Sequence, residues 1–246
     1  FTQSGKGGGS HGDYAILYRG NHQARLFEKA LREHNIPYFL SGGTSFFSRA
    51  EIKDLMAYLR LLANPEDDAA FLRIVNTPRR EIGPGTLEKL ADYARGRSTH
   101  LLAACDELGL AEQLSDKPRA RLQRFSELVL RYARMAESDD PLRTVRELVD
   151  ELDYRDWLRE ISSSEQAAAR RIENVEELID WLKNLRKGER ADAPLAELVN
   201  HLSLMDILER QDQEEGGDQV HLMTLHSAKG LEFPHVFLVG MEEELL

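Results

Sequence analysis

Apolar residues form short uninterrupted runs near both ends of the chain. Residues 13–19 (DYAILYR) and 36–40 (IPYFL) flank an amphipathic stretch at 22–34. Two further β-prone runs, QVHLMTL at 219–225 and HVFLVGM at 235–241, lie near the C-terminus. Compact apolar runs bounded by turn residues predict buried strands. The order strand, helix, strand over residues 13–40 predicts a βαβ unit.

Between these ends, from Arg49 to about Arg210, apolar positions recur at helical spacing almost throughout. In EIKDLMAYLRLLAN, which starts at Glu51, the apolar residues recur every three or four positions, which is typical of a helix packed on one side. Further helices are predicted at 67–76, 86–96, 119–136, 141–152, 165–187 and 194–210. No repeat of fixed period accompanies them. The chain therefore changes from α/β to all-α and back again.

This order of segments predicts one α/β domain interrupted by a long helical insert. We expect a flexible Gly-rich linker at 1–12, the first part of the α/β domain at 13–48, the insert at 49–216 and the second part at 217–246. Only about four strands can be counted, so the α/β domain is expected to be partial. The predicted fold class is mainly α, a helical insert within a partial α/β domain.

The net charge of −11 at first argues against a nucleic-acid partner. The distribution changes this interpretation: residues 1–136 hold 20 Lys+Arg and 16 Asp+Glu, whereas residues 137–217 hold 11 and 22. The acidity lies mainly in one late segment, and the first half of the chain can still contact DNA. We expect the acidic segment to be a solvated helical surface that repels DNA.

Several protein classes are excluded or disfavoured by composition. No run of about 18 apolar residues is present, so no membrane span is expected. The N-terminus lacks the apolar stretch of a signal peptide, and the single Cys105 excludes an internal disulfide and a thiolate metal cluster. No His, Cys and carboxylate groups stand at metal-ligand spacing, so no metal site is expected. A cytoplasmic location is the corresponding expectation.

Two blocks of sequence carry a family resemblance. The first block consists of DYAILYRGNHQARLFEKAL at 13–31 and a second stretch at 36–83, which begins IPYFLSGGTSFFSRAEIKD. The second block is QVHLMTLHSAKGLEFPHVFLVGMEE at 219–243. They resemble motifs IV and V of superfamily 1 DNA helicases of the Rep/UvrD/PcrA group. The sequence of the first block is most similar to the Rep branch of that group. Between 97 and 215 the resemblance is one of helical character and length only.

The resemblance implies two RecA-like domains that bind ATP between them and step 3′→5′ along single-stranded DNA. The α/β parts would belong to the second of these, domain 2A. The insert would be domain 2B, which touches duplex DNA and restrains unwinding. Partners would be single-stranded DNA, the duplex junction and other replication or repair proteins.

The ATP-binding elements of that family have no counterpart in this sequence. Gly5-Lys6 is followed by Gly7, without the spacing or the flanking strand and helix of a phosphate-binding loop. The acidic Mg²⁺ motif and the Arg-bearing motif VI are also absent. ATP and Mg²⁺ are therefore expected in the parent protein, while this chain alone is expected to bind neither and to be inactive. The resemblance gives Glu232 the role of accepting a hydrogen bond from the nucleotide ribose.

Candidate residues for single-stranded DNA lie where two predicted strands end. Arg19 and Asn21 follow the first strand, at the sheet edge where α/β proteins bind ligands, and Asn21 can also cap the next helix. Thr224, His226 and Lys229 lie in the loop after the third strand and suit contacts with phosphates or a stacked base. The alternative is a surface Arg, a capping Asn and a packed His.

The sequence NTPRREIGPGTLEKL at 76–90 predicts a tight connection between two helices. Free N–H groups at the second helix start can bind a duplex phosphate without reading sequence. The turn resembles the family's Gly-Ile-Gly duplex contact, although Glu81 replaces the first glycine. A plain interhelical turn is the alternative. The candidate duplex-binding residues are Thr77, Arg79, Arg80, Ile82, Gly83, Gly85 and Thr86, with Thr86 as the expected cap.

Other residues have simpler interpretations. Arg119, Arg121, Arg124, Arg131 and Arg134 recur at helical spacing, and such runs are usually solvated faces. The aromatic residues Phe46, Phe47, Tyr58 and Phe71 suit hinge or core packing better than base stacking. The competing function is a helical protein-interaction or regulatory module without a motor role, for which TLHSAKGLEF would be unnecessary. A fused nuclease is disfavoured, because no paired carboxylate-Lys constellation is present.

Overall fold

The chain forms two compact units. The computed structural model describes residues 9–20, 23–34, 36–41, 45–138, 140–187, 191–215 and 217–240. One unit, here called the α/β unit, comprises residues up to Arg49 and from Ser203 onward; the other, the helical unit, comprises Ala50–Leu202. In sequence, the helical unit therefore lies between the two parts of the α/β unit.

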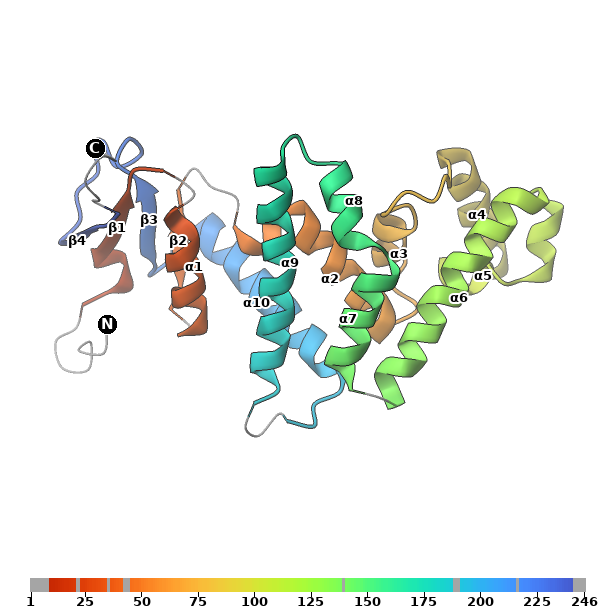
Figure 1. The fold of residues 1–246 in the computed structure, drawn as a ribbon. Helices are drawn as coiled ribbons and strands as arrows, with labels where there is room; N and C mark the ends of the chain where they lie inside the picture. The colour runs from red at the N-terminus through yellow and green to blue at the C-terminus, as the bar shows by residue number, and fades with distance from the viewer. Residues whose placement is uncertain are drawn as a thin grey trace. The chain divides into compact units, whose positions relative to one another are not determined.

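The α/β unit contains a four-stranded parallel sheet (Figure 1). Its strands are β1 (Tyr14–Tyr18), β2 (Tyr38–Leu40), β3 (Val220–Thr224) and β4 (His235–Leu238), in the order β2-β3-β1-β4. The four predicted strands are confirmed. Strand β1 pairs with β3, although the whole helical unit lies between them in the sequence. Segments from both ends of the chain therefore form one sheet.

Helix α1 (Ala24–Glu33) covers one face of this sheet. Each fully buried large apolar side chain in this layer contributes about 1.5–3 kcal/mol, so the layer fixes α1 on the strands. Glu28 and Arg32 of α1 are also buried. The core of this layer comprises Ile16, Tyr18, Ala24, Leu31, Tyr38, Leu40, Val220 and Leu222.

Regular structure in the α/β unit begins at His11, two residues before residue 13, where the sequence predicts that the α/β domain starts. The 3-10 helix η1 (His11–Asp13) precedes β1. The Asp218 carboxylate accepts from the Gly12 N–H at 2.7 Å and from the Ser10 hydroxyl. Residues 10–12 are thereby tied to the segment before β3. The remainder of the predicted linker, 1–8, lies outside the described residues.

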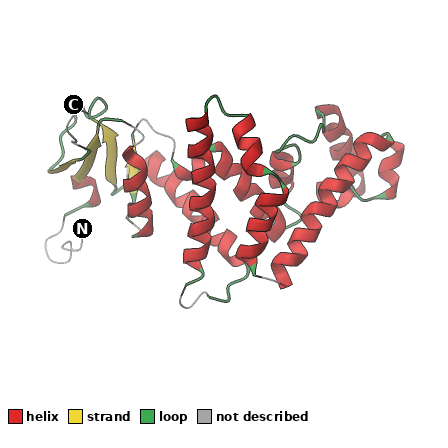
Figure 2. Cartoon of the chain, in the orientation of Figure 1, coloured by secondary structure: helices red, strands yellow, loops and turns green. Residues whose placement is uncertain are grey.

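The helical unit consists of helices and loops in its described residues (Figure 2). The helices predicted from periodicity are confirmed. Two short helices, α5 and α8, are not among the predicted ones, and the four residues of α5 are too few to show a helical period. The 3-10 helix η3 (Phe46–Ser48) precedes α2, and η4 (Leu108–Glu112) precedes α6. The helices are α2 (Ala50–Ala63), α3 (Asp68–Ile74), α4 (Pro84–Arg97), α5 (Leu101–Ala104), α6 (Asp116–Ser138), α7 (Pro141–Glu151), α8 (Tyr154–Glu160), α9 (Glu165–Leu185) and α10 (Leu195–Glu215).

Helix α2 is the centre of this unit and packs against α3, α6 and α9. Tyr58 and Phe71 are fully buried, as expected, and the Phe71 ring meets that of Phe125 edge-on at 5.4 Å. The buried Glu51 carboxylate accepts from the Asn174 amide at 2.5 Å, and the Tyr154 hydroxyl donates to the Glu51 carbonyl at 3.1 Å. These bonds satisfy polar groups that would otherwise be costly to bury.

The units divide close to one predicted boundary and away from the other. The first division, after Arg49, lies one residue beyond the predicted start of the insert at 49. The second, after Leu202, falls inside α10 rather than at the predicted residue 216. Among the described residues, no helix combines the length and apolar character that crossing a membrane requires.

Candidate nucleic-acid interface

The carboxyl ends of β1 and β3 bring two of the predicted DNA-contacting segments together. The backbone N–H of Leu225, just after β3, donates to the carbonyl of Tyr18, the last residue of β1, at 2.9 Å. Arg19 therefore emerges beside the 225–230 loop. This edge of a parallel sheet is where α/β proteins place ligand-binding loops.

The 225–230 loop is held by its own hydrogen bonds. The Thr224 hydroxyl lies 2.9 Å from the Ser227 hydroxyl and accepts from the Ser227 N–H at 3.1 Å. The Ala228 N–H donates to the Thr224 carbonyl at 3.0 Å. Thr224 therefore shapes the loop rather than presenting a free hydroxyl. The side chains of His226 and Lys229 are exposed.

An open hollow of ≈ 370 Å³ lies at the same edge. Leu17, Leu225 and Ala228 provide apolar walls, and His226 and Lys229 line it as well. An apolar surface beside an imidazole and an ammonium suits a nucleotide, whose base stacks and whose phosphate attracts cations.

Gln23 organises the turn that carries Arg19, a role that the sequence analysis missed. Its side-chain Oε1 accepts from the N–H groups of Arg19 and Gly20 at 3.0 and 3.1 Å. Gly240 has a φ of +68°, and a Cβ there would lie 2.1 Å from Gln23 Nε2, so glycine leaves room for the amide. Gln23 is also the residue preceding α1, where Asn21 was the predicted cap; Asn21 itself lies outside the described residues.

Glu232 lies in the irregular segment between the loop and β4, with its side chain exposed. Its carboxylate is accessible to a ligand.

The 76–86 turn connects α3 to α4 in the helical unit. Ile82 is buried and anchors it, and the Asn76 side chain accepts from the Arg80 and Ile82 N–H groups at 2.7 and 3.3 Å. Helix α4 is capped by Gly83, with Pro84 as its first residue. The prediction that Thr86 is the cap is therefore wrong: the helix begins at Pro84, so the cap lies three residues earlier, at Gly83.

The exposed start of α4 leaves backbone accessible around two glycines. A Cβ at Gly83 or Gly85 would meet nothing within 4 Å, so a ligand could approach the backbone there. The side chain of Thr77 is half-buried, and its carbonyl accepts from the Tyr58 hydroxyl at 2.7 Å. Thr77 thus supports the turn from behind.

Arg80 is a structural residue of this turn, not a free cation. Its guanidinium donates to the carbonyls of Ile74, Val75 and Pro78 at 3.0, 3.3 and 3.1 Å. It also donates to the Tyr58 hydroxyl at 2.6 Å. Burial raises the pKa of Tyr58 to about 12, despite this neighbouring cation. The Arg80 guanidinium therefore closes the end of α3, and the duplex contact predicted for it stays a prediction.

The guanidinium of Arg80 also lies over the Phe125 ring, 4.9 Å from its centre. Arg79, its neighbour in sequence, is exposed. Of the two adjacent arginines, Arg79 is the more exposed.

Glu81 adopts the left-handed conformation, with φ of +56°. Glycine enters this region without a steric penalty, which explains why the turn that it resembles has glycine at this position. The charge of Glu81 is paired: Arg121 of α6 forms an ion pair with its carboxylate and donates to its carbonyl at 2.9 Å. The predicted negative charge beside the phosphate site is thus partly offset.

The remaining charged stretches behave as surface. Arg119 pairs with Asp116 at 3.0 Å and Arg131 with Glu151 at 2.5 Å, so these arginines of the basic stretch have acidic partners. The Arg131 guanidinium and the Tyr132 hydroxyl lower the pKa of Glu151. Within the described residues, no cluster of His, Cys, Asp or Glu could hold a metal ion.

Comparison with known proteins gives a consistent result. The family model for the UvrD-like helicase C-terminal domain matches residues 5–246. ATP-dependent DNA helicase Rep from Escherichia coli (strain K12) is 52% identical over 236 residues, 95% of this chain and 35% of that protein. DNA helicase II from the same organism is 42% identical over 238 residues, 96% of this chain and 32% of that protein. ATP-dependent DNA helicase PcrA from Bacillus subtilis (strain 168) is 39% identical over 235 residues, 94% of this chain and 31% of that protein. The chain spans about a third of the length of these relatives.

Proposed function

Because this chain belongs to the family of UvrD-like helicase C-terminal domains, we propose that it is part of an ATP-dependent 3′–5′ DNA helicase acting in replication or repair. It contributes part of the single-stranded DNA track and, as domain 2B, a duplex contact that restrains unwinding. The observation that carries this proposal is the joined edge of β1 and β3, where Arg19 and the 225–230 loop lie together.

In this proposal, the edge of the α/β unit binds single-stranded DNA. Arg19 and Lys229 bind backbone phosphates, and His226 stacks on a base above the hollow. Thr224 contributes by setting the loop geometry. Asn21 contacts the same strand.

ATP and Mg²⁺ bind in the parent protein, and Glu232 accepts a hydrogen bond from the ribose. An ionised carboxylate offers acceptors only, which suits a sugar hydroxyl. The groups that bind the ATP phosphates lie in other parts of the parent protein, so this chain alone does not hydrolyse ATP. Phosphoryl transfer requires those groups together with the metal.

The helical unit binds duplex DNA through the start of α4. Exposed backbone at Gly83 and Gly85 faces one phosphate, and Arg79 supplies positive charge. Such contacts position the duplex without reading its sequence. Ile82, Thr77 and Thr86 support the turn.

Replacing Glu81 by glycine should increase duplex affinity at low salt by about threefold, because one negative charge leaves the phosphate site. The free energy of unfolding should change by less than about 1 kcal/mol, since relief of the positive φ offsets the lost pair with Arg121. Anisotropy titrations of a labelled duplex measure the first effect. Unchanged affinity in a folded Glu81→Gly protein would show that Glu81 is not beside bound phosphate.

The proposed activity is tested in the full-length protein. It should hydrolyse ATP faster with single-stranded DNA and unwind a duplex that has a 3′ tail better than one with a 5′ tail. Protein without ATP is the control. No DNA-stimulated ATP turnover would contradict the proposal and favour a helical protein-interaction module.

A further inference from the structure

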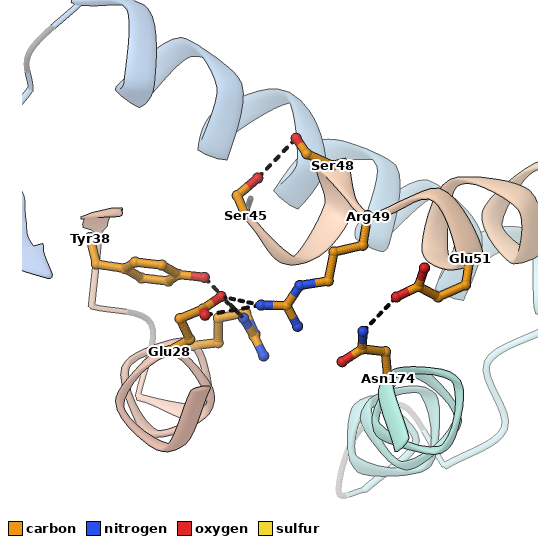
Figure 3. Close-up of polar contacts among 8 residues, drawn as sticks. Glu28, Tyr38, Ser45, Ser48, Arg49, Glu51 and Asn174 are labelled. Carbon is orange, nitrogen blue, oxygen red and sulfur yellow. Dashed lines mark hydrogen bonds and ion pairs between the residues drawn. The ribbon is translucent and has the colours of Figure 1, made fainter. Parts of the chain in front are cut away.

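A buried ion cluster surrounds Glu28 of α1 (Figure 3). The Glu28 side chain is 2% exposed, and Arg49 Nη2 donates to both carboxylate oxygens, at 3.0 and 2.9 Å. A second guanidinium, that of Arg32, lies 3.5 Å from the same carboxylate and donates to the Tyr38 hydroxyl at 2.9 Å. The cluster therefore links α1 and β2 to the segment that ends at Arg49.

Aromatic packing holds the same segment. The guanidinium carbons of Arg32 and Arg49 lie 4.3 and 5.5 Å from the centre of the Phe46 ring. Phe46 and Phe47 are buried and meet edge-on at 5.5 Å. The Ser45 hydroxyl donates to that of Ser48 at 2.9 Å. Residues 45–49 are thus fixed on the α/β unit through side chains and ring contacts.

The chemistry of the cluster favours a role in geometry. Burying a carboxylate is costly, and attraction to paired guanidinium groups offsets this cost without large net stabilisation. Removing one partner leaves an uncompensated buried charge. Most ion pairs of the helical unit are more exposed, such as Arg159 with Asp156. A buried pair at a defined place specifies one arrangement of the chain.

That place is the boundary between the two units. Arg49 is the last residue of the α/β unit before the helical unit, and α2 begins at Ala50. The second crossing, after Leu202, lies within the continuous helix α10. Arg49, the residue held by Glu28, is thus the residue at which the chain first leaves the α/β unit.

We propose that Glu28 is a positioning residue that, by holding Arg49, fixes where the chain enters the helical unit. Rotation at this crossing then takes place in the backbone beyond Arg49, unless the ion pair breaks. The inference rests on the proposed function of the helical unit as a duplex-binding accessory domain. As a consequence, the helical unit, which contains the duplex-binding turn, is attached to the α/β unit at a fixed residue.

The test measures orientation in the full-length protein without DNA. Dyes are attached through Leu26→Cys in α1 and Leu108→Cys in η4, residues that are 76% and 90% exposed, and single-molecule energy transfer is recorded. Glu28→Gln keeps the side-chain size and removes the charge. We expect its distribution of transfer efficiencies to broaden. Glu33→Gln, at an exposed residue of the same helix, is the matched control and should keep the original width.

Further variants separate the anchor from a general loss of folding. Arg49→Lys keeps the charge but replaces the planar guanidinium, which reaches both Glu28 oxygens and lies over the Phe46 ring, by a shorter ammonium side chain, and it should broaden the distribution in the same way. Circular dichroism identifies the variants that remain folded. If folded Glu28→Gln and Arg49→Lys proteins give a distribution of transfer efficiencies as narrow as that of the unsubstituted protein, the proposal is overturned. Because no DNA or ATP is present, this result is distinguishable from a failure to unwind DNA.

Discussion

Replacing Arg80 by alanine should lower the free energy of unfolding of the helical unit by about 2–4 kcal/mol. The guanidinium donates to three carbonyls at the end of α3 and to the Tyr58 hydroxyl. It also covers the Phe125 ring. Each hydrogen bond from a charged group contributes about 1.5–3 kcal/mol, but bonds that share one side chain do not add. The range therefore stays well below their sum.

Arg79 provides the matched control for this prediction. Its side chain is exposed, so Arg79→Ala should change the free energy of unfolding by less than about 0.5 kcal/mol. Urea unfolding followed by tryptophan fluorescence measures both variants. The two tryptophans, Trp157 and Trp181, lie in the helical unit and report on it. Equal stability of the two variants would contradict the role given to Arg80.

The second large effect concerns single-stranded DNA. Replacing His226 by alanine should weaken binding by about tenfold, because loss of one base stack costs about 1–3 kcal/mol. Lys229→Ala should weaken it less at physiological salt and lower the slope of log affinity against log salt by about 0.7. Both side chains are exposed beside the hollow at the end of β1 and β3.

An exposed lysine outside the proposed site serves as the control for that experiment. Lys183 lies on α9 in the acidic part of the chain, so Lys183→Ala should leave affinity and salt slope unchanged. Anisotropy titrations with a labelled oligonucleotide across a salt series measure all three variants. If Lys183→Ala weakens binding as much as Lys229→Ala, binding reflects general attraction rather than this edge.

The fold was largely predictable because its signals are local. Short apolar runs identified the four strands, and periodicity identified the long helices. The helix boundaries depended on less visible features: Pro84 moved the start of α4 ahead of Thr86, and Gln23 rather than Asn21 precedes α1. Helix α5 was not predicted because its four residues cover only about one turn.

The candidate site was predictable in position but not in the roles of individual side chains. Arg79 and Arg80 are adjacent and chemically identical in the sequence, yet only the structure shows that one closes α3. The pair between Glu81 and Arg121 joins residues 40 positions apart, and no local pattern indicates such a contact. The family resemblance located the loop after β3, whereas the hydrogen bonds of Thr224 identified the residue that shapes it.

These findings also change how the duplex contact should be examined. A double substitution of Arg79 and Arg80 would mix lost charge with lost stability. Arg79→Ala alone removes charge from the turn while the end of α3 stays closed. It should reduce duplex affinity by a few fold and lower the salt slope by about 1.

The most direct measurement of the account is a crossed comparison of His226→Ala and Arg79→Ala with single-stranded and duplex DNA across salt. We predict that His226→Ala weakens binding of the single strand alone, and that Arg79→Ala weakens binding of the duplex alone. Two separate DNA-contacting surfaces, one on each unit, would produce this pattern. Equal loss on both substrates in either variant, or no loss in both, would contradict it.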